Sequence, residues 1–242
     1  MRDGGDDLER LARDVVACRR CPRLVAHRER VARVKRRQFC DQTYWGRPLP
    51  GFGDARARLL IVGLAPAAHG GNRTGRMFTG DQSGDWLMCA LSRAGFANQP
   101  RSVACGDGLR LRDAYITAGL RCAPPDNKPT PLELRTCRPY LARERALLGR
   151  VCVIVALGQV AFAAVLATER SRCTALPQPL PRFAHGAMVQ VGDVVLIASY
   201  HPSRQNTQTG RLSAAMLAAV FRRARQQLGG RRSSGSTLPV TA

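Results

Sequence analysis

Residues 59–81 read LLIVGLAPAAHGGNRTGRMFTGD, an apolar, β-branched run followed by a loop rich in glycine and polar residues. Residues 194–212, VVLIASYHPSRQNTQTGRL, repeat this order of an apolar run and a polar loop. In an open parallel sheet, ligands bind in the crevice beyond the carboxyl ends of the strands. We therefore expect the two loops, far apart in the sequence, to face one pocket that suits a polar, partly anionic ligand.

Other segments extend this pattern of strands and helices. Apolar runs predict further strands at residues 114–118, 151–157 and 188–191. Helical periodicity predicts helices at residues 8–17, 83–94, 131–150, 160–167 and 213–228. We expect residues 31–53 to be irregular. The alternation of the two element types predicts an α/β fold in which helices cover both faces of a mostly parallel sheet.

The chain has 242 residues, of which 45% are hydrophobic, enough for one domain with its own core. We place this domain at residues 1–228 and expect the small, polar residues 229–242 to form a disordered tail. No apolar run reaches the roughly 18 residues that a membrane-spanning helix needs. The N-terminal MRDGGDDLER lacks the apolar centre of a secretion signal. We expect a cytoplasmic monomer that does not associate with membranes.

The chain is strongly basic. It has 38 Lys and Arg against 17 Asp and Glu, which gives a formal net charge of +21. A field this positive favours a polyanionic partner, with nucleic acid as the leading candidate. The alternative is a basic protein without such a partner, because net charge says nothing about fold or specificity.

Nine cysteines are present, and an odd number in a cytoplasmic chain argues against a disulfide framework. Cys18 and Cys21 form a C-x-x-C pair, and Cys122 and Cys137 complete a candidate set of four thiolates. Such a set suits zinc or an iron–sulfur cluster equally well, and the alternative is that these cysteines are small core residues. Of the others, we expect core positions for Cys89, Cys152 and Cys173, and leave Cys40 and Cys105 unassigned.

Two polar residues of the loops are candidates for catalysis. Asp81 precedes a predicted helix for which Ser83 is a candidate N-cap. Its carboxylate either interacts with the helix dipole or positions an attacking water as general base. His201 follows a strand, where its imidazole either stabilises a developing anion or forms a local hydrogen bond in the loop.

Other loop residues have a functional and a structural interpretation. His69 lines the pocket or lies in a flexible loop, and Phe78 stacks on a planar ligand or packs in the core. Asn127 contacts a ligand or caps a turn. The tip at Arg204, Gln205 and Asn206 enters a groove of a partner or is a solvated loop.

Together, GLAPAAHGGNRTGRMFTGD, YITAGLRCAPPDNKPTP with the downstream Cys137, and HPSRQNTQTGRL resemble the uracil-DNA glycosylase superfamily. More narrowly, the chain resembles the type-B branch (family 5), which consists of iron–sulfur enzymes. The resemblance extends from about Cys18 to Leu228. It implies a three-layer α/β/α sandwich with a central, mainly parallel, four-stranded sheet. It also implies a structural 4Fe–4S cluster, with ligands at Cys18, Cys21, Cys122 and Cys137.

The implied activity is DNA base-excision repair by a monofunctional glycosylase. The enzyme hydrolyses the N-glycosidic bond of uracil, or of another deaminated base such as hypoxanthine, after that base is flipped out of double-stranded DNA. His201 stabilises the anionic leaving base, and Asp81 positions water or stabilises the cationic sugar. The base-binding group comprises Gly63, Ala67, His69, Phe78 and Asn127, and the DNA-binding loop comprises Ser203, Arg204, Gln205 and Asn206.

Two departures from the uracil-selective enzymes affect this interpretation. Their first motif has an acid soon after the Gly-x-x-Pro turn, where this chain has Ala67 and Ala68. They also have an asparagine at the end of the second strand, where this chain has Ala118. Loss of an amide that reads the base edge predicts relaxed selectivity. The missing acid leaves one alternative, a cluster-stabilised nucleic-acid-binding module without catalysis.

Overall fold

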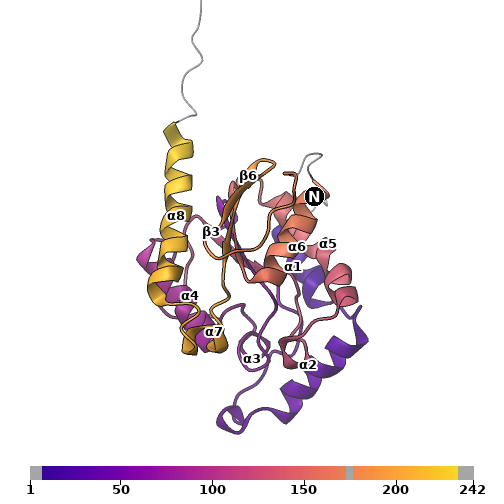
Figure 1. Cartoon of the computed structure of the whole chain (residues 1–242). Helices are drawn as coiled ribbons and strands as arrows, with labels where there is room; N and C mark the ends of the chain where they lie inside the picture. Colours follow the sequence, from indigo (N-terminus) through magenta and orange to yellow (C-terminus); the bar gives the residue numbers. More distant parts are fainter. Residues whose placement is uncertain (1–6, 173–176, 234–242) are drawn as a thin grey trace, which may run out of the picture.

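The computed structural model describes residues 7–172 and 177–233, which form three layers, with helices on both faces of one sheet (Figure 1). Within these residues the sheet has six strands in the order β1-β3-β2-β4-β6-β5. They are β1 (Phe52–Gly53), β2 (Leu59–Gly63), β3 (Ala114–Ala118), β4 (Val153–Leu157), β5 (Met188–Val191) and β6 (Val194–Ser199). The four inner strands are parallel, whereas β1 and β5 pair antiparallel at the edges. The predicted sandwich is confirmed, and two short edge strands extend its four-stranded centre.

The helices of the described residues divide between the two faces. They are α1 (Leu8–Val16), α2 (Pro22–Val34), α3 (Gly71–Thr74), α4 (Gln82–Arg93), α5 (Pro131–Leu147), α6 (Gln159–Arg170), α7 (Arg204–Gln208) and α8 (Ala214–Ser233). Two 3-10 turns, η1 (Arg37–Phe39) and η2 (Pro125–Asn127), lie in the connections. Helices α4 and α8 pack together on one face, and α5 and α6, with α1 against α5, cover the other (Figure 1). No helix of residues 7–172 and 177–233 is long and apolar enough to cross a membrane.

The alternation of side chains along each inner strand builds two separate cores. In β2, Leu59 and Ile61 are buried in the cluster on the α4 and α8 side, while Leu60 and Val62 are buried in the opposite cluster. Burial of each such side chain contributes about 1.5–3 kcal/mol to folding. The sheet is thus a rigid support for the loops at the carboxyl ends of its strands.

Two sequence predictions about the elements need correction. Residues 31–53 are not wholly irregular, because α2 extends to Val34 and both η1 and β1 lie in this range. Helix α8 extends to Ser233, so residues 229–233 are helical and do not belong to a tail. Residues 234–242 and Cys173 lie outside the described residues.

Candidate active site and cysteine pocket

The two polar loops lie together at the carboxyl ends of β2 and β6, as the sequence predicts. The rings of Phe78 and His201 are stacked, with centroids 5.9 Å apart and planes inclined by 30°. Nearby, Gln82 Nε2 donates a hydrogen bond of 3.3 Å to Thr207 Oγ1, and so joins the start of α4 to α7. Figure 1 shows α3, α4 and α7 at this end of the sheet.

Phe78 lies directly on the end of strand β2. A Cβ atom added to Gly63 would lie 2.7 Å from Cζ of the Phe78 ring, so only glycine allows this approach. Phe78 also has a positive φ of +50°, a strained conformation for a residue with a side chain. Such strain persists only where the surroundings hold it in place. The aromatic ring of Phe78 is therefore held in a fixed position at the carboxyl end of strand β2.

His201 is half-buried, and burial lowers its pKa to about 4. The imidazole is therefore neutral at pH 7, with one N–H donor and one acceptor nitrogen. Its backbone carbonyl accepts a hydrogen bond of 2.9 Å from Asn206 Nδ2, which connects the residue to α7. The site thus presents a neutral hydrogen-bond donor beside the Phe78 ring.

Asp81, and not Ser83 as predicted, is the N-cap of α4. Its Oδ1 accepts a hydrogen bond of 2.9 Å from the Gly84 amide. A Cβ atom on Gly70 would lie 1.9 Å from Asp81 Oδ2, so the carboxylate packs against the first loop. Burial raises the pKa of Asp81, and the Gly84 amide partly opposes the shift. One oxygen therefore caps the helix while the other faces the loop.

The remaining base-binding candidates occupy different positions. His69 Nδ1 is 3.0 Å from the Tyr44 hydroxyl, and the Ala67 carbonyl closes the turn of the loop by accepting from the Gly70 amide at 3.3 Å. Asn127 is exposed in η2 with a φ of +56°, where its amide donates to the Pro124 carbonyl. No interaction within the described residues links Asn127 to the stacked rings, and its place fits a turn residue.

The predicted DNA-binding tip is a short helix. Ser203 is the N-cap of α7, where its Oγ accepts a hydrogen bond of 3.4 Å from the Asn206 amide. Arg204 and Gln205 are exposed in the first turn, whereas Asn206 is half-buried. The cap fixes the backbone of the tip, so the exposed side chains of Arg204 and Gln205 start from a fixed position.

A buried polar network, which the sequence did not indicate, holds the segment between Phe78 and Asp81. Arg76 Nη2 donates to both carboxylate oxygens of Asp107 at 2.8 Å and to Ser102 Oγ at 2.8 Å. The hydroxyls of Ser102 and Thr79 are 2.6 Å apart, and the Ser102 carbonyl accepts from the Gly80 amide at 2.8 Å. Because these groups are far apart in sequence and individually ordinary, no local motif signals their association.

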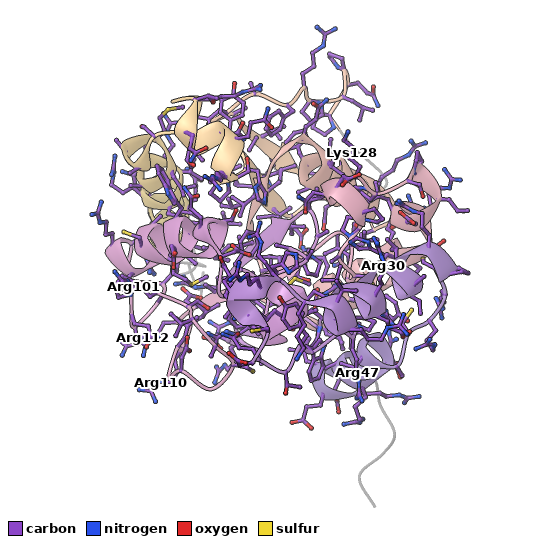
Figure 2. All side chains as sticks on the ribbon, turned by 90° about the horizontal axis from the view of Figure 1, so that it is seen from below. Arg30, Arg47, Arg101, Arg110, Arg112 and Lys128 are labelled. Carbon is purple, nitrogen blue, oxygen red and sulfur yellow. The ribbon has the colours of Figure 1, made fainter. Side chains whose placement is uncertain are left out.

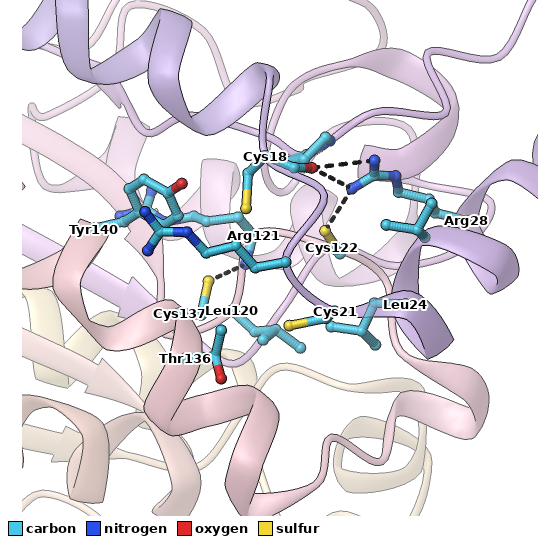
Figure 3. Close-up of a pocket in the computed structure, with 13 residues that line it drawn as sticks. Cys18, Cys21, Leu24, Arg28, Leu120, Arg121, Cys122, Thr136, Cys137 and Tyr140 are labelled. Atoms are coloured by element: carbon cyan, nitrogen blue, oxygen red, sulfur yellow. Dashed lines mark hydrogen bonds between the residues drawn. The ribbon is translucent and has the colours of Figure 1, made fainter.

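The four predicted cysteines line one pocket (Figure 3). Cys18 follows α1, Cys21 precedes α2, Cys122 lies in the loop after β3, and Cys137 lies on α5. No three His, Cys, Asp or Glu side chains in the described part of the chain are placed to hold a single metal ion. The thiols surround a space and do not converge on one point.

Three arginines that sequence reasoning missed also line this pocket: Arg20, Arg28 and Arg121. Arg28 Nη1 donates to Cys122 Sγ at 3.0 Å and to the Cys18 carbonyl at 3.3 Å. The backbone amide of Arg121 donates to Cys137 Sγ at 3.3 Å. Burial raises the pKa of the free Cys137 thiol to about 12. The other described cysteines are half-buried at Cys89 and Cys152 and exposed at Cys40 and Cys105.

Comparisons with known proteins agree with this architecture. The model of the uracil DNA glycosylase superfamily matches residues 50–225. The chain is 52% identical to the type-5 uracil-DNA glycosylase of Mycobacterium leprae, over 95% of this chain and 99% of the relative. It is 51% identical to the type-5 uracil-DNA glycosylase of Thermus thermophilus, over 92% of this chain and 99% of the relative. It is 54% identical to that of Mycobacterium bovis, over 89% and 80% of the two chains. The chain therefore belongs to the uracil DNA glycosylase superfamily.

Proposed function

We propose that this protein is a DNA repair enzyme that hydrolyses the N-glycosidic bond of uracil, and of other deaminated bases such as hypoxanthine, in double-stranded DNA. The observation that supports it best is the stack of Phe78 on His201, which joins the two loops at the carboxyl ends of β2 and β6. The relatives named type-5 uracil-DNA glycosylases match over most of both chains. The glycosidic carbon is inaccessible inside a duplex, so the target nucleotide must be flipped out.

The aromatic ring of Phe78 receives the flipped base. Stacking on an aromatic side chain contributes about 1–3 kcal/mol per base and tolerates different bases, because every base has a π-face. Phe78 is held against Gly63, so little conformational freedom is lost when the base arrives. Ala118, at the end of β3, has no side-chain amide that could select uracil. The site therefore favours planar bases of more than one kind.

His201 stabilises the leaving base. As the glycosidic bond breaks, negative charge develops on the base and positive character on the sugar. A neutral imidazole donates its N–H to a base carbonyl oxygen as that oxygen becomes negative. Because the pKa of His201 is lowered to about 4, it makes this contact at neutral pH without first losing a proton. The imidazole acts as an electrostatic stabiliser, with no proton transfer required.

Asp81 supplies the carboxylate that residues 65–68 lack. Its Oδ2 lies against Gly70 in the first loop, while its Oδ1 is held by the Gly84 amide. From this position the carboxylate orients the attacking water or stabilises the cationic sugar. The hydrogen bond to Gly84 restricts the side chain, which reduces the reorganisation needed during the reaction.

The cysteine pocket suits a 4Fe–4S cluster held by Cys18, Cys21, Cys122 and Cys137. A cluster needs four thiolates around a space several ångströms wide, whereas zinc needs donors that converge within about 2.3 Å of one point. Four cysteines from segments far apart in the chain line one pocket, and a full set of four thiolates is the donor set that such a cluster uses. When bound, the group supplies a structural cross-link between the segments that hold the four cysteines. Base excision uses no electrons, so its role is structural.

Exposed Arg and Lys side chains on the side of the molecule that contains the candidate active site favour binding of a polyanion such as DNA. Figure 2 shows the molecule from below, the side on which α3 and α7 lie in Figure 1. None of the labelled side chains forms an ion pair with a carboxylate in the described part of the chain: Arg30, Arg47, Arg101, Arg110, Arg112 and Lys128. Arg204 of α7 adds an exposed cation next to the site.

We assign the protein to the cytoplasm, associated with the nucleoid through DNA, and expect it to act as a monomer.

The test is single-turnover excision from labelled duplexes that contain one uracil or one hypoxanthine, followed by alkaline cleavage of abasic sites. We expect cleavage at both bases. Cleavage at uracil alone would show that Ala118 does not relax selectivity. Binding without cleavage, by protein with a verified iron content, would favour the non-catalytic nucleic-acid-binding module.

A further inference from the structure

Three arginines of the described chain are at most 2% exposed: Arg28, Arg121 and Arg145. Arg121 is paired with Glu144, which is itself 1% exposed, and Arg145 is paired with Glu169, also 1% exposed. Arg28 has no buried carboxylate. Its nearest acid is Glu29 at 3.9 Å, which is 40% exposed and bonded at 2.6 Å to Arg19. Among the described residues, the charge of Arg28 is therefore compensated only by this long, exposed ion pair and by the Cys18 carbonyl.

A weakly compensated guanidinium cannot escape burial by losing its proton, because arginine stays charged in proteins. Burial of an unpaired charge is strongly unfavourable, so such a group requires an anion nearby. The side chain of Arg28 lines the cysteine cavity, and its Nη1 donates to Cys122 Sγ (Figure 3). Its Nε is buried without a hydrogen-bond partner. Charge and donors together point to an anionic occupant beside Cys122.

We infer that Arg28 is the counter-charge of the thiolate-bound cluster and sets the reduction potential of that cluster. This inference rests on the cluster proposed above. A 4Fe–4S cluster bound by four thiolates has a net charge of −2, which becomes −3 when it accepts one electron. A fixed cation at a ligand sulfur stabilises the more negative state. Arg28 thus raises the potential, and it also opposes loss of iron from the thiolates.

The same arginine connects the cysteine pocket to the substrate loop. The backbone carbonyl of Arg28 accepts a hydrogen bond of 3.2 Å from Asn72 Nδ2, and Asn72 is fully buried in α3. Helix α3 belongs to the loop whose Gly70 packs against Asp81. A cluster that holds Arg28 therefore also fixes one end of the loop at the excision site. Arg28 acts as a positioning residue that does not touch the substrate.

The test compares the reduction potential of the cluster in the wild-type protein with that in three variants. Each potential is measured by electrochemical titration, in which the electrode supplies the one electron that reduces the cluster. Arg28→Lys keeps the charge, Arg28→Gln keeps a donor without the charge, and Arg28→Met removes both. We expect the potential to decrease in the order wild type, Lys, Gln, Met. In parallel, a ferrous chelator should remove iron several-fold faster from the Gln and Met variants than from the Lys variant.

Other outcomes would overturn the inference. Equal potentials and equal rates of iron loss across the series would make Arg28 a packing residue only. If the neutral variants do not retain a cluster, Arg28→Lys decides alone: loss of the cluster from this variant as well, although it keeps the charge, would contradict the inference. Stoichiometric zinc in place of iron in the wild type would refute it. Failure of uracil excision in a protein whose potential follows the expected order would refute the proposed activity and leave the role of Arg28 standing.

Discussion

The excision site and the cysteine pocket lie on the same sheet but respond to burial in opposite ways. His201 is a half-buried basic group, and its partial burial lowers its pKa to about 4, so that it is neutral at pH 7. Arg28 is even more buried, but its guanidinium keeps its charge at any accessible pH. The first site therefore becomes a neutral hydrogen-bonding pocket, and the second requires an anion. Whether a buried cation can lose its proton decides which kind of site it builds.

The largest expected effect comes from turning a compensated arginine into an uncompensated one. Glu144→Gln leaves Arg121 charged and buried beside the cysteine pocket, without the carboxylate that now contacts both terminal nitrogens. Removal of one partner of a buried ion pair costs about 3–5 kcal/mol of unfolding free energy. Urea denaturation at pH 7 measures this loss. The double variant Arg121→Met with Glu144→Leu serves as the control and should lose less, whereas an equal loss would show that packing and not charge is responsible.

The next effect concerns the position of the Asp81 carboxylate. Asp81→Asn should slow single-turnover excision by about 10²–10⁴-fold with little change in the Kd for DNA, because it removes the charge that orients water. Gly70→Ala should also slow excision, because the added methyl group would overlap Asp81 Oδ2. Gly149→Ala is the matched control, since a Cβ there meets nothing within 4 Å. Normal excision by Asp81→Asn would remove this carboxylate from the chemistry.

A smaller effect is the pH dependence that His201 contributes to stability. The pKa of this residue is about 4 when folded, against an ordinary value of 6.5. Between these values the unfolded chain binds a proton that the folded chain does not, so the unfolding free energy falls as the pH decreases from 6.5 towards 4. Urea denaturation of wild type and His201→Gln should show the wild type losing more stability over this range. If the unfolding free energies of the two proteins depend on pH in the same way, burial does not lower the pKa of His201.

The smallest effect is expected at the exposed tip of α7. Arg204→Gln should weaken binding to all duplexes alike and reduce the salt slope of log K by about 1, as for one lost phosphate contact. Arg150→Gln is a suitable control, because this exposed residue precedes β4 and so lies at the opposite ends of the strands. Fluorescence anisotropy at several salt concentrations measures both slopes. An unchanged slope for Arg204→Gln would exclude a phosphate contact at this position.

Sequence patterns predicted what depends on local order in the chain. Apolar runs followed by polar loops identified the inner strands and the two loops that meet at Phe78 and His201. The C-x-x-C pair and the two later cysteines were correctly grouped around one cavity. In each case the residue type and its neighbours contain the information.

What the sequence did not reveal depends on contacts between distant segments. Helix α2 was missed because Arg28 interrupts its apolar face, although Pro22 at its first turn is a common start signal. The cap of α4 was assigned to Ser83, since both Ser and Asp favour N-caps and only the backbone decides between Asp81 and Ser83. The partners of Arg28 and Arg76 come from other elements, so no local pattern identifies either residue as part of a site.

The central claim is that a neutral His201 stabilises the leaving base at a site formed by two loops. The most direct test is single-turnover excision of uracil from duplex DNA by His201→Ala, with the Kd for the same duplex measured in parallel. Loss of one such donor typically lowers the rate by about 10²–10³-fold. We predict a loss of this size with the Kd nearly unchanged. An excision rate equal to that of the wild type would contradict the account.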